Sequence, residues 1–167
     1  MSVLFYKRGG HFYFITMNEQ TLIATEIQIK YEPNVRPLDR PKILTPEDAY
    51  LQCLFFFNHD NLSIKEEAVV LFLNRGNRVL GGYKLSSGGI AGTIVDIRII
   101  LSIALKSLAS GLILAHNHPS GELTPSRADK ELTQKLKEAS KLMDILLLDH
   151  LIIDKSNYYS FADNGEI

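Results

Sequence analysis

Cysteine, net charge and long apolar runs are all scarce in this sequence, and each shortage excludes a class of protein. Cys53 is the only cysteine among 167 residues, so the chain can form no intramolecular disulfide. It also lacks the Cys-x-x-Cys pair that a zinc-dependent deaminase needs. A chain without disulfides is typical of a reducing compartment, and we therefore expect a cytoplasmic location.

The charge and hydropathy patterns narrow the choice further. Lys and Arg number 18 against 19 Asp and Glu, which gives a formal net charge of −1. No overall basic surface therefore favours the binding of nucleic acid. The apolar stretches are too short and too often interrupted for a signal peptide or a membrane-spanning helix. A hydrophobic content of 46% and a charged content of 22% are those of an ordinary globular domain.

Helical and extended patterns alternate along most of the chain. Apolar spacing and N-cap residues predict helices that begin after Thr45, Asp96 and Ser126. Short apolar runs predict buried strands at residues 66–73, 111–115 and 145–153. This order predicts an α/β fold in which helices pack on a mixed β-sheet.

Residues 1–44 differ from the rest of the chain and are predicted to form a separate N-terminal region. Residues 3–6 and 12–15 have the composition of two short strands, which indicates a hairpin, and residues 21–30 are a candidate third strand. A proline-rich, charged stretch follows and is typical of an extended arm. We therefore place the main domain at residues 45–167.

Two histidines follow the apolar run at residues 111–115. Because side chains alternate along a strand, His116 and His118 leave the chain on the same face. Ser126 then precedes an amphipathic helical pattern, so it is a natural N-cap and places Asp129 in the first helical turn. A helix that begins there can bring the Asp129 carboxylate back to the two imidazoles.

Two imidazoles and one carboxylate are a suitable ligand set for an open zinc site. Three protein ligands leave a fourth position for water, which is the arrangement of catalytic rather than structural zinc sites. Each feature alone has a simpler explanation, since a lone histidine is usually structural and Ser-x-x-Asp before an apolar run is often only a helix cap. Their joint spacing favours the metal site.

Two glutamates and one polar pair are further candidates. Glu66 and Glu67 lie at the edge of a predicted strand and point to opposite faces, so one of them can act as a catalytic glutamate. Both can also be solvated charges at a strand end. Asp149 and His150 lie within an apolar strand, where buried polar groups need partners. One of them either orients a zinc ligand or makes a structural hydrogen bond.

The spacing His116-x-His118, seven residues and then Ser126-x-x-Asp129 resembles the JAMM signature of MPN/JAB metalloproteases. The segment His-Asn-His-Pro-Ser-Gly, followed by Pro-Ser-x-x-Asp, is similar to the corresponding sequence in the RadC-like branch of that family. Five separated segments agree with this branch in the same order, and the resemblance covers roughly residues 45–165.

The resemblance implies a cytidine-deaminase-like α/β fold and a zinc-dependent hydrolase. The two histidines and Asp129 would hold Zn²⁺, and alignment of the strand places the family's catalytic glutamate on Glu66 rather than Glu67. Glu66 would accept a proton from the attacking water and pass it to the leaving amine. Ser126 would hydrogen-bond the oxyanion or the attacking water. The implied reaction is hydrolysis of a peptide or isopeptide bond in an unidentified protein or peptide.

Two other functions stay open. RadC-like proteins carry a DNA-repair label and a metal hydroxide can attack phosphate, but near-neutral charge argues against tight DNA binding. The helix-hairpin-helix region usual in RadC-like proteins is not visible in this sequence, and a salt-sensitive gel shift would favour the repair function. The third candidate is a non-catalytic interaction module that keeps its metal for folding. Unchanged activity and stability after Glu66→Gln would favour that module.

Overall fold

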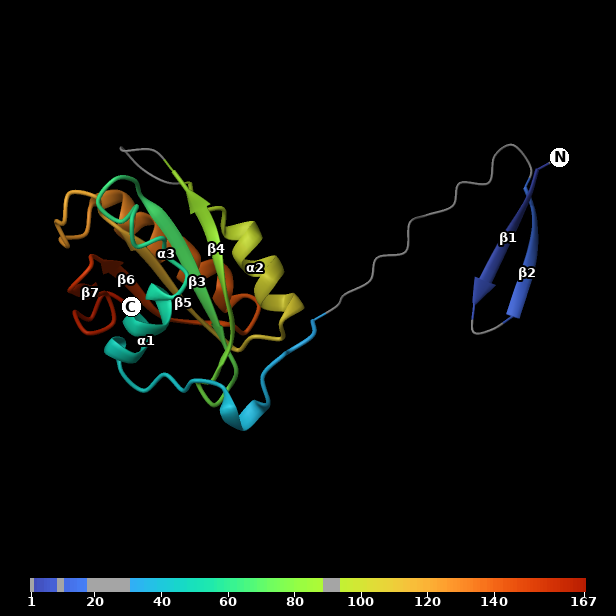
Figure 1. Ribbon diagram of the computed structural model, residues 1–167, viewed down its shortest axis with the longest axis horizontal. Coiled ribbons are helices and arrows are strands. Elements are labelled where there is room, and N and C mark those ends of the chain that lie inside the picture. The colour runs from blue at the N-terminus through green and yellow to red at the C-terminus, as the bar shows by residue number, and fades with distance from the viewer. Residues whose placement is uncertain (1, 9–10, 18–30, 89–93) are drawn as a thin grey trace.

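The computed structural model describes residues 2–8, 11–17, 31–88 and 94–167. In chain order its elements are β1 (Ser2–Arg8), β2 (His11–Met17), the short 3-10 helix η1 (Pro37–Asp39), α1 (Pro46–Leu54), β3 (Glu67–Leu73), β4 (Val79–Ser87), α2 (Ile97–Lys106), β5 (Gly111–Asn117), α3 (Arg127–Lys141), β6 (Leu146–Ile153) and β7 (Tyr158–Ser160). Five strands form one sheet in the order β4-β3-β5-β6-β7 (Figure 1). The β5–β6 pair is parallel and the other pairs are antiparallel, so the predicted mixed α/β fold is confirmed.

Strands β1 and β2 pair with each other as an antiparallel hairpin. Both lie where the sequence predicts strands, whereas the candidate strand at residues 21–30 falls outside the described residues. Part of the predicted arm, residues 32–41, contacts the main sheet, since the Pro41 carbonyl accepts from the Val79 N–H of β4 at 2.9 Å and the Arg40 carbonyl accepts from Arg78 Nη1 at 2.8 Å. The division of the chain into an N-terminal region and a main domain stays a prediction.

The central strands are buried on both faces, and their alternate residues belong to two separate cores. Every residue of β3 and β5 is buried. Helix α1 packs on one face of the sheet, while α2 and α3 cover the other (Figure 1). Leu112 and Leu114 of β5 lie in the core beneath α2 and α3. Alternation therefore places His116 on that same face.

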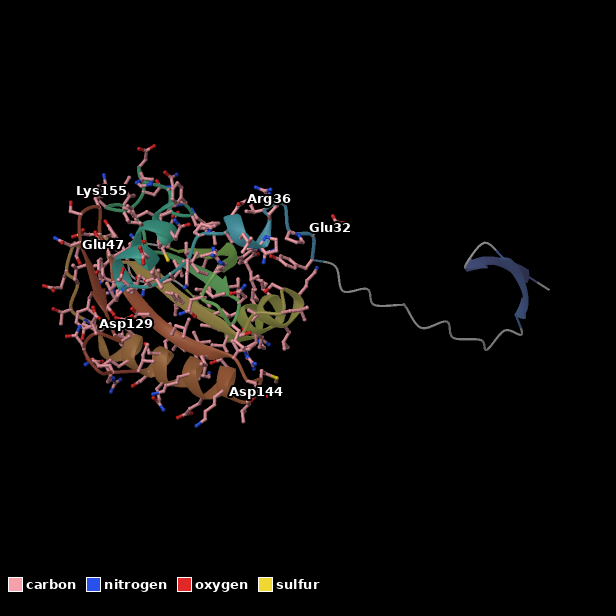
Figure 2. The ribbon with its side chains drawn as sticks, turned by 90° about the horizontal axis from the view of Figure 1, so that it is seen from below. Glu32, Arg36, Glu47, Asp129, Asp144 and Lys155 are labelled. Carbon is pink, nitrogen blue, oxygen red and sulfur yellow. The ribbon has the colours of Figure 1, made fainter. Side chains whose placement is uncertain are left out.

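The connection from β5 through α3 to β6 determines where the N-terminus of α3 lies. Parallel neighbours need such a crossover, and the carboxyl end of the first strand then lies beside the start of the helix. Ser126 caps α3, because its Oγ accepts from the Asp129 N–H at 3.2 Å and its own N–H donates to Asp129 Oδ2 at 2.7 Å. Figure 2 shows Asp129 near the start of α3 and Asp144 just beyond its end.

Asp149 ties the end of the chain to β6. Its Oδ1 accepts from the backbone N–H groups of His150 and Ala162, at 2.7 and 3.0 Å, and its Oδ2 accepts from the Ser160 hydroxyl at 2.6 Å. Burial raises the pKa of the Asp149 carboxyl above 3.8, and these three hydrogen bonds only partly oppose that effect. Asp149 therefore has the structural role that the sequence left open.

We expect Asp149→Asn to fold and to change how stability depends on pH. The amide oxygen can keep both backbone donors, and the amide nitrogen can donate to Ser160. In the wild type the raised pKa means that the folded state holds the proton more tightly than the unfolded chain. This stabilisation is complete below pH 3.8 and is lost as pH rises through the folded-state pKa.

Chemical unfolding of both proteins between roughly pH 4 and pH 7 tests this expectation. The free energy of unfolding of Asp149→Asn should rise relative to the wild type as pH increases. A difference that stays constant across this range would show that burial does not perturb the Asp149 carboxyl.

Candidate metal centre

His116, His118 and Asp129 meet where β5 ends and α3 begins. His116 is the penultimate residue of β5, His118 lies just beyond the strand, and Asp129 is in the first turn of α3. His116 is buried, while the side chains of Asp129 and His118 remain 13% and 17% exposed. The cluster is therefore held in the core on one side and open to solvent on the other.

The three side chains converge with the spacing of metal ligands. The two histidine Nε2 atoms lie 3.0 Å apart, and the Asp129 carboxylate oxygens lie 3.2 Å from His116 Nε2 and 3.6 Å from His118 Nε2. One ligand atom from each residue falls within 4.8 Å of the others. Ligand atoms around a tetrahedral zinc ion are about 3.3–3.5 Å apart. The arrangement fits such an ion with little movement.

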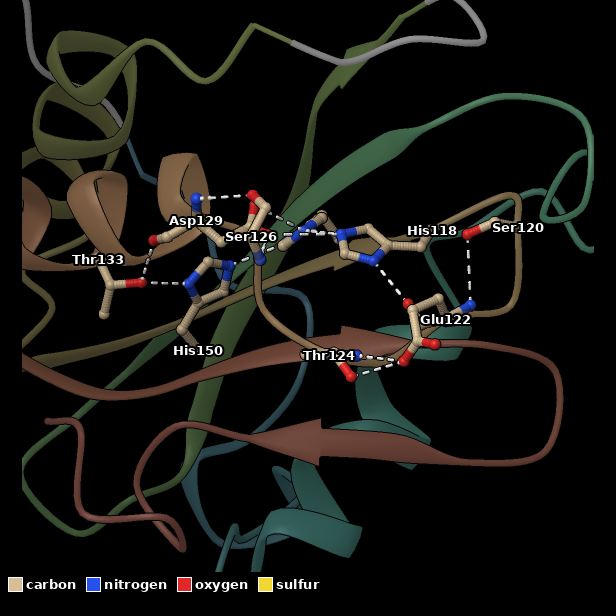
Figure 3. A network of polar contacts seen from close by, with 9 residues as sticks. His118, Ser120, Glu122, Thr124, Ser126, Asp129, Thr133 and His150 are labelled. Atoms are coloured by element: carbon tan, nitrogen blue, oxygen red, sulfur yellow. Dashed lines mark hydrogen bonds and ion pairs between the residues drawn. The ribbon is translucent and has the colours of Figure 1, made fainter.

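The hydrogen bond on the far side of the His118 ring determines which nitrogen faces the cluster. His118 Nδ1 lies 2.6 Å from the backbone carbonyl of Glu122 (Figure 3). A carbonyl oxygen only accepts, so Nδ1 carries the proton. In the neutral ring Nε2 then presents a lone pair toward His116 and Asp129, as metal coordination requires.

The cluster attracts positive charge. Burial alone would raise the pKa of Asp129. Hydrogen bonds with Ser126, and with His116 and His118 when their Nε2 atoms are protonated, outweigh burial and hold that pKa far below its ordinary value. The hydrogen bond with Asp129 raises the pKa of His118, with further contributions from the Glu122 carbonyl and the charge of Glu66, while burial opposes the change. An anionic carboxylate beside two imidazoles binds either protons or a cation.

His150 and Thr133 extend the cluster into the core (Figure 3). His150 Nε2 lies 2.9 Å from His116 Nδ1, and His150 Nδ1 lies 2.6 Å from Thr133 Oγ. Burial lowers the pKa of His150 well below 6.5, so its ring is neutral. Thr133 is one helical turn after Asp129 and therefore lies on the same helix face, a spacing that sequence reasoning did not use.

Glu67 points away from the histidines. Its carboxylate accepts from Lys84 Nζ at 2.8 Å and from the backbone N–H of Asn58 at 3.1 Å. Its side chain is only 2% exposed. Glu67 thus contributes a buried carboxylate to a partly exposed ion pair with Lys84 on the α1 side of the sheet.

Glu66 lies on the histidine side. Ala68 is directly opposite His116 in the β3–β5 register, and Glu66 is two residues earlier, so alternation places it on the same face as the imidazole. Its negative charge is among the causes of the raised pKa of His118. Glu66 is half-buried, which leaves its carboxylate in contact with solvent.

Asn117, between the two histidines, was not singled out from the sequence. It is fully buried, and its Oδ1 accepts from the Glu67 N–H at 2.8 Å. Its Nδ2 donates to the carbonyls of Leu62 and Lys65, at 2.7 and 3.0 Å. Asn117 therefore fastens the loop that leads to Glu66 onto the strand that carries both histidines.

Residues 43–166 match the RadC-like JAB domain family. The chain belongs to that family. It is 57% identical over 100 residues to a UPF0758 protein of Flavobacterium johnsoniae, covering 60% of this chain and 44% of the relative. It is 46% identical over 103 residues to a UPF0758 protein of Streptococcus sanguinis, covering 62% and 45%. It is also 46% identical over 101 residues to UPF0758 protein YfjY of Escherichia coli, covering 60% and 63%.

The region that matches the family includes His116, His118 and Asp129. The region aligned with the relatives is only part of their length. The matched region spans less than half the length of the Flavobacterium and Streptococcus proteins. The fold and the His-His-Asp cluster are consistent with a JAMM-type metal site. Among the described residues, no helix has both the length and the apolar character needed to cross a membrane. The expected cytoplasmic location stays a prediction.

Proposed function

We propose that this protein is a zinc-dependent hydrolase of the JAMM type, which cleaves peptide or isopeptide bonds. The convergence of His116, His118 and Asp129 within 4.8 Å carries the proposal. The membership of this protein in the RadC-like JAB domain family supports the same reaction class. The side chains of Asp129 and His118 are partly exposed, so a substrate carbonyl can approach the cluster from their side.

The donor set favours zinc. Imidazole and carboxylate ligands suit Zn²⁺, although other first-row metals accept the same ligands. Such an ion would lower the pKa of a water molecule and polarise a carbonyl oxygen. His116 and His118 would contribute Nε2, and Asp129 one carboxylate oxygen.

Glu66 and Ser126 would handle the protons and the developing charge. The half-buried Glu66 carboxylate lies on the histidine face and can take the proton of the attacking water, then deliver it to the leaving amine nitrogen. The Ser126 Oγ accepts a backbone hydrogen bond from Asp129, yet it still has its own proton to donate. That proton can stabilise an oxyanion beside the cluster.

The substrate is proposed only as a class, a protein or peptide with an accessible amide bond. A DNA substrate has less support, because the formal net charge of −1 offers no general attraction to phosphates. A non-catalytic role in protein interaction would keep the metal cluster but would not need Glu66.

Cleavage of a peptide mixture in heavy-oxygen water tests the proposal. Zinc-loaded protein is incubated with a tryptic digest of a bacterial lysate and with a synthetic isopeptide-linked pair, and new carboxyl ends are identified by mass spectrometry. We expect zinc-dependent cleavage with heavy oxygen in the product. Asp129→Ala should be inactive, whereas Glu131→Ala, which changes an exposed residue of the same helix, should keep activity. No cleavage by the wild type, or equal cleavage by Asp129→Ala, would contradict the proposal.

A further inference from the structure

A buried relay of hydrogen bonds runs from the backbone of α3, through Thr133 and His150, to the ring of His116. Thr133 Oγ donates to the Asp129 carbonyl at 2.6 Å and also lies 2.6 Å from His150 Nδ1. His150 Nε2 in turn lies 2.9 Å from His116 Nδ1. Thr133, His150 and His116 are at most 3% exposed, so water cannot replace any of these partners.

The position of every proton in this relay follows from the Asp129 carbonyl, where the relay begins. The Asp129 carbonyl has no proton, so the single hydroxyl proton of Thr133 must be donated to it. Full burial of the His150 ring disfavours its charged form, so the ring carries one proton. Thr133 Oγ is an acceptor for His150, so that proton lies on Nδ1. His150 Nε2 is therefore an acceptor, and His116 Nδ1 must carry the proton that it accepts.

The result is a lone pair on His116 Nε2, the atom that faces His118 and Asp129. The His150 ring is also held in place by stacking on Phe161, with ring centroids 4.7 Å apart and planes inclined by 13°. Resting on the proposed function, we propose that Thr133 and His150 are positioning residues that fix the tautomer of His116, so that its Nε2 is unprotonated and available to a metal ion.

A purely structural role for this pair would predict something different. Thr133 and His150 could then be replaced by any side chains of similar shape without changing where the proton of His116 lies. The relay instead makes the Thr133 hydroxyl, an atom two residues removed from the metal, the determinant of that proton.

The matched variants Thr133→Val and Thr133→Ser separate the two roles. Valine has the shape of threonine but no hydroxyl, so a proton on His150 Nδ1 would be buried without a partner. Moving that proton to Nε2 lets His150 donate to His116, whose own proton is then forced onto Nε2. Serine keeps the hydroxyl and should keep the wild-type tautomers.

The first measurement uses metal-free protein labelled with ¹⁵N in histidine. Long-range proton–nitrogen spectra report which ring nitrogen is protonated, with His150→Gln used to assign the His150 signals. We expect His116 and His150 to carry the proton on Nδ1 in the wild type and in Thr133→Ser, and on Nε2 in Thr133→Val. Unchanged tautomers in folded Thr133→Val would overturn the inference.

The second measurement is zinc affinity, by competition with a chromophoric chelator. Loss of a hydrogen bond that orients a ligand typically weakens metal binding by about 10–100-fold. We expect a loss of that size in Thr133→Val and a much smaller one in Thr133→Ser, with thermal unfolding showing that both are folded. Equal affinity of Thr133→Val and the wild type would also overturn the inference.

A second pair of variants tests His150, the middle residue of the relay. The amide oxygen of His150→Gln can still accept from His116 Nδ1, whereas His150→Leu leaves that donor unpaired. Zinc affinity should therefore be lower in His150→Leu than in His150→Gln, and the reverse order would count against the relay. Failure of the proposed function is distinguishable, since a wild type that binds no zinc contradicts that function while the histidine spectra still decide the relay.

Discussion

The Glu66→Gln protein is expected to hydrolyse amide bonds about 10²–10⁴-fold more slowly than the wild type while binding zinc equally well. Glutamine keeps the shape of the side chain but cannot take a proton from water. Glu66 is half-buried on the histidine face, and it belongs to no set of three that could hold a metal among the described residues. The rate should therefore fall without loss of the metal.

Glu67→Gln is the matched control for this experiment. It removes the buried carboxylate that pairs with Lys84 at 2.8 Å, so it should lower stability more than Glu66→Gln does. Its activity per folded molecule should stay near that of the wild type. A large loss of activity in Glu67→Gln with normal activity in Glu66→Gln would reverse the assignment. Full activity in both would favour a site without a glutamate base.

Zinc is expected to raise the thermal midpoint of the wild-type protein substantially. A ligand that binds only the folded state stabilises it by about 4 kcal/mol when present at about 1,000 times its dissociation constant. For a domain of this length such a gain corresponds to a rise of about 8–16 °C. Removal of the ion by a chelator should reverse the rise.

The rise should depend on the ligand cluster alone. Asp129→Ala should show almost none of it, whereas Glu131→Ala, in the same helix and exposed to solvent, should show all of it. An equal rise in Asp129→Ala would place the stabilising ion elsewhere on the protein.

Alternation and capping explain why the sequence predicted the convergence of the three candidate ligands. The period of a strand puts His116 and His118 on one face, and a Ser126 N-cap fixes the start of α3. Both rules act over a few residues, so they can be read without a structure. The parallel β5–β6 pair then requires a crossover that returns the helix to the end of the strand.

Other parts of the site depend on contacts that local patterns do not contain. The partner of His116 is His150, 34 residues later, and it is linked in turn to Thr133 of a different element. The sequence left open whether Asp149 or His150 orients a ligand. The structure separates them because the two residues leave β6 on opposite faces, Asp149 toward the C-terminal segment and His150 toward α3.

Which of Glu66 and Glu67 faces the histidines also depends on long-range register. Counting along one strand shows only that the two glutamates face opposite ways. The pairing of Ala68 with His116 shows that Glu66, and not Glu67, lies on the face of the histidines. The hydrogen bonds of Asn117 hold the loop that precedes the two glutamates.

Elemental analysis of purified protein tests the central claim most directly. Wild type, Asp129→Ala and Glu131→Ala are expressed with zinc, purified identically and analysed for bound metals. We predict about one zinc ion per chain in the wild type and in Glu131→Ala, and almost none in Asp129→Ala. Folded wild-type protein without metal, or an equal zinc content in Asp129→Ala, would contradict a metal centre built from His116, His118 and Asp129.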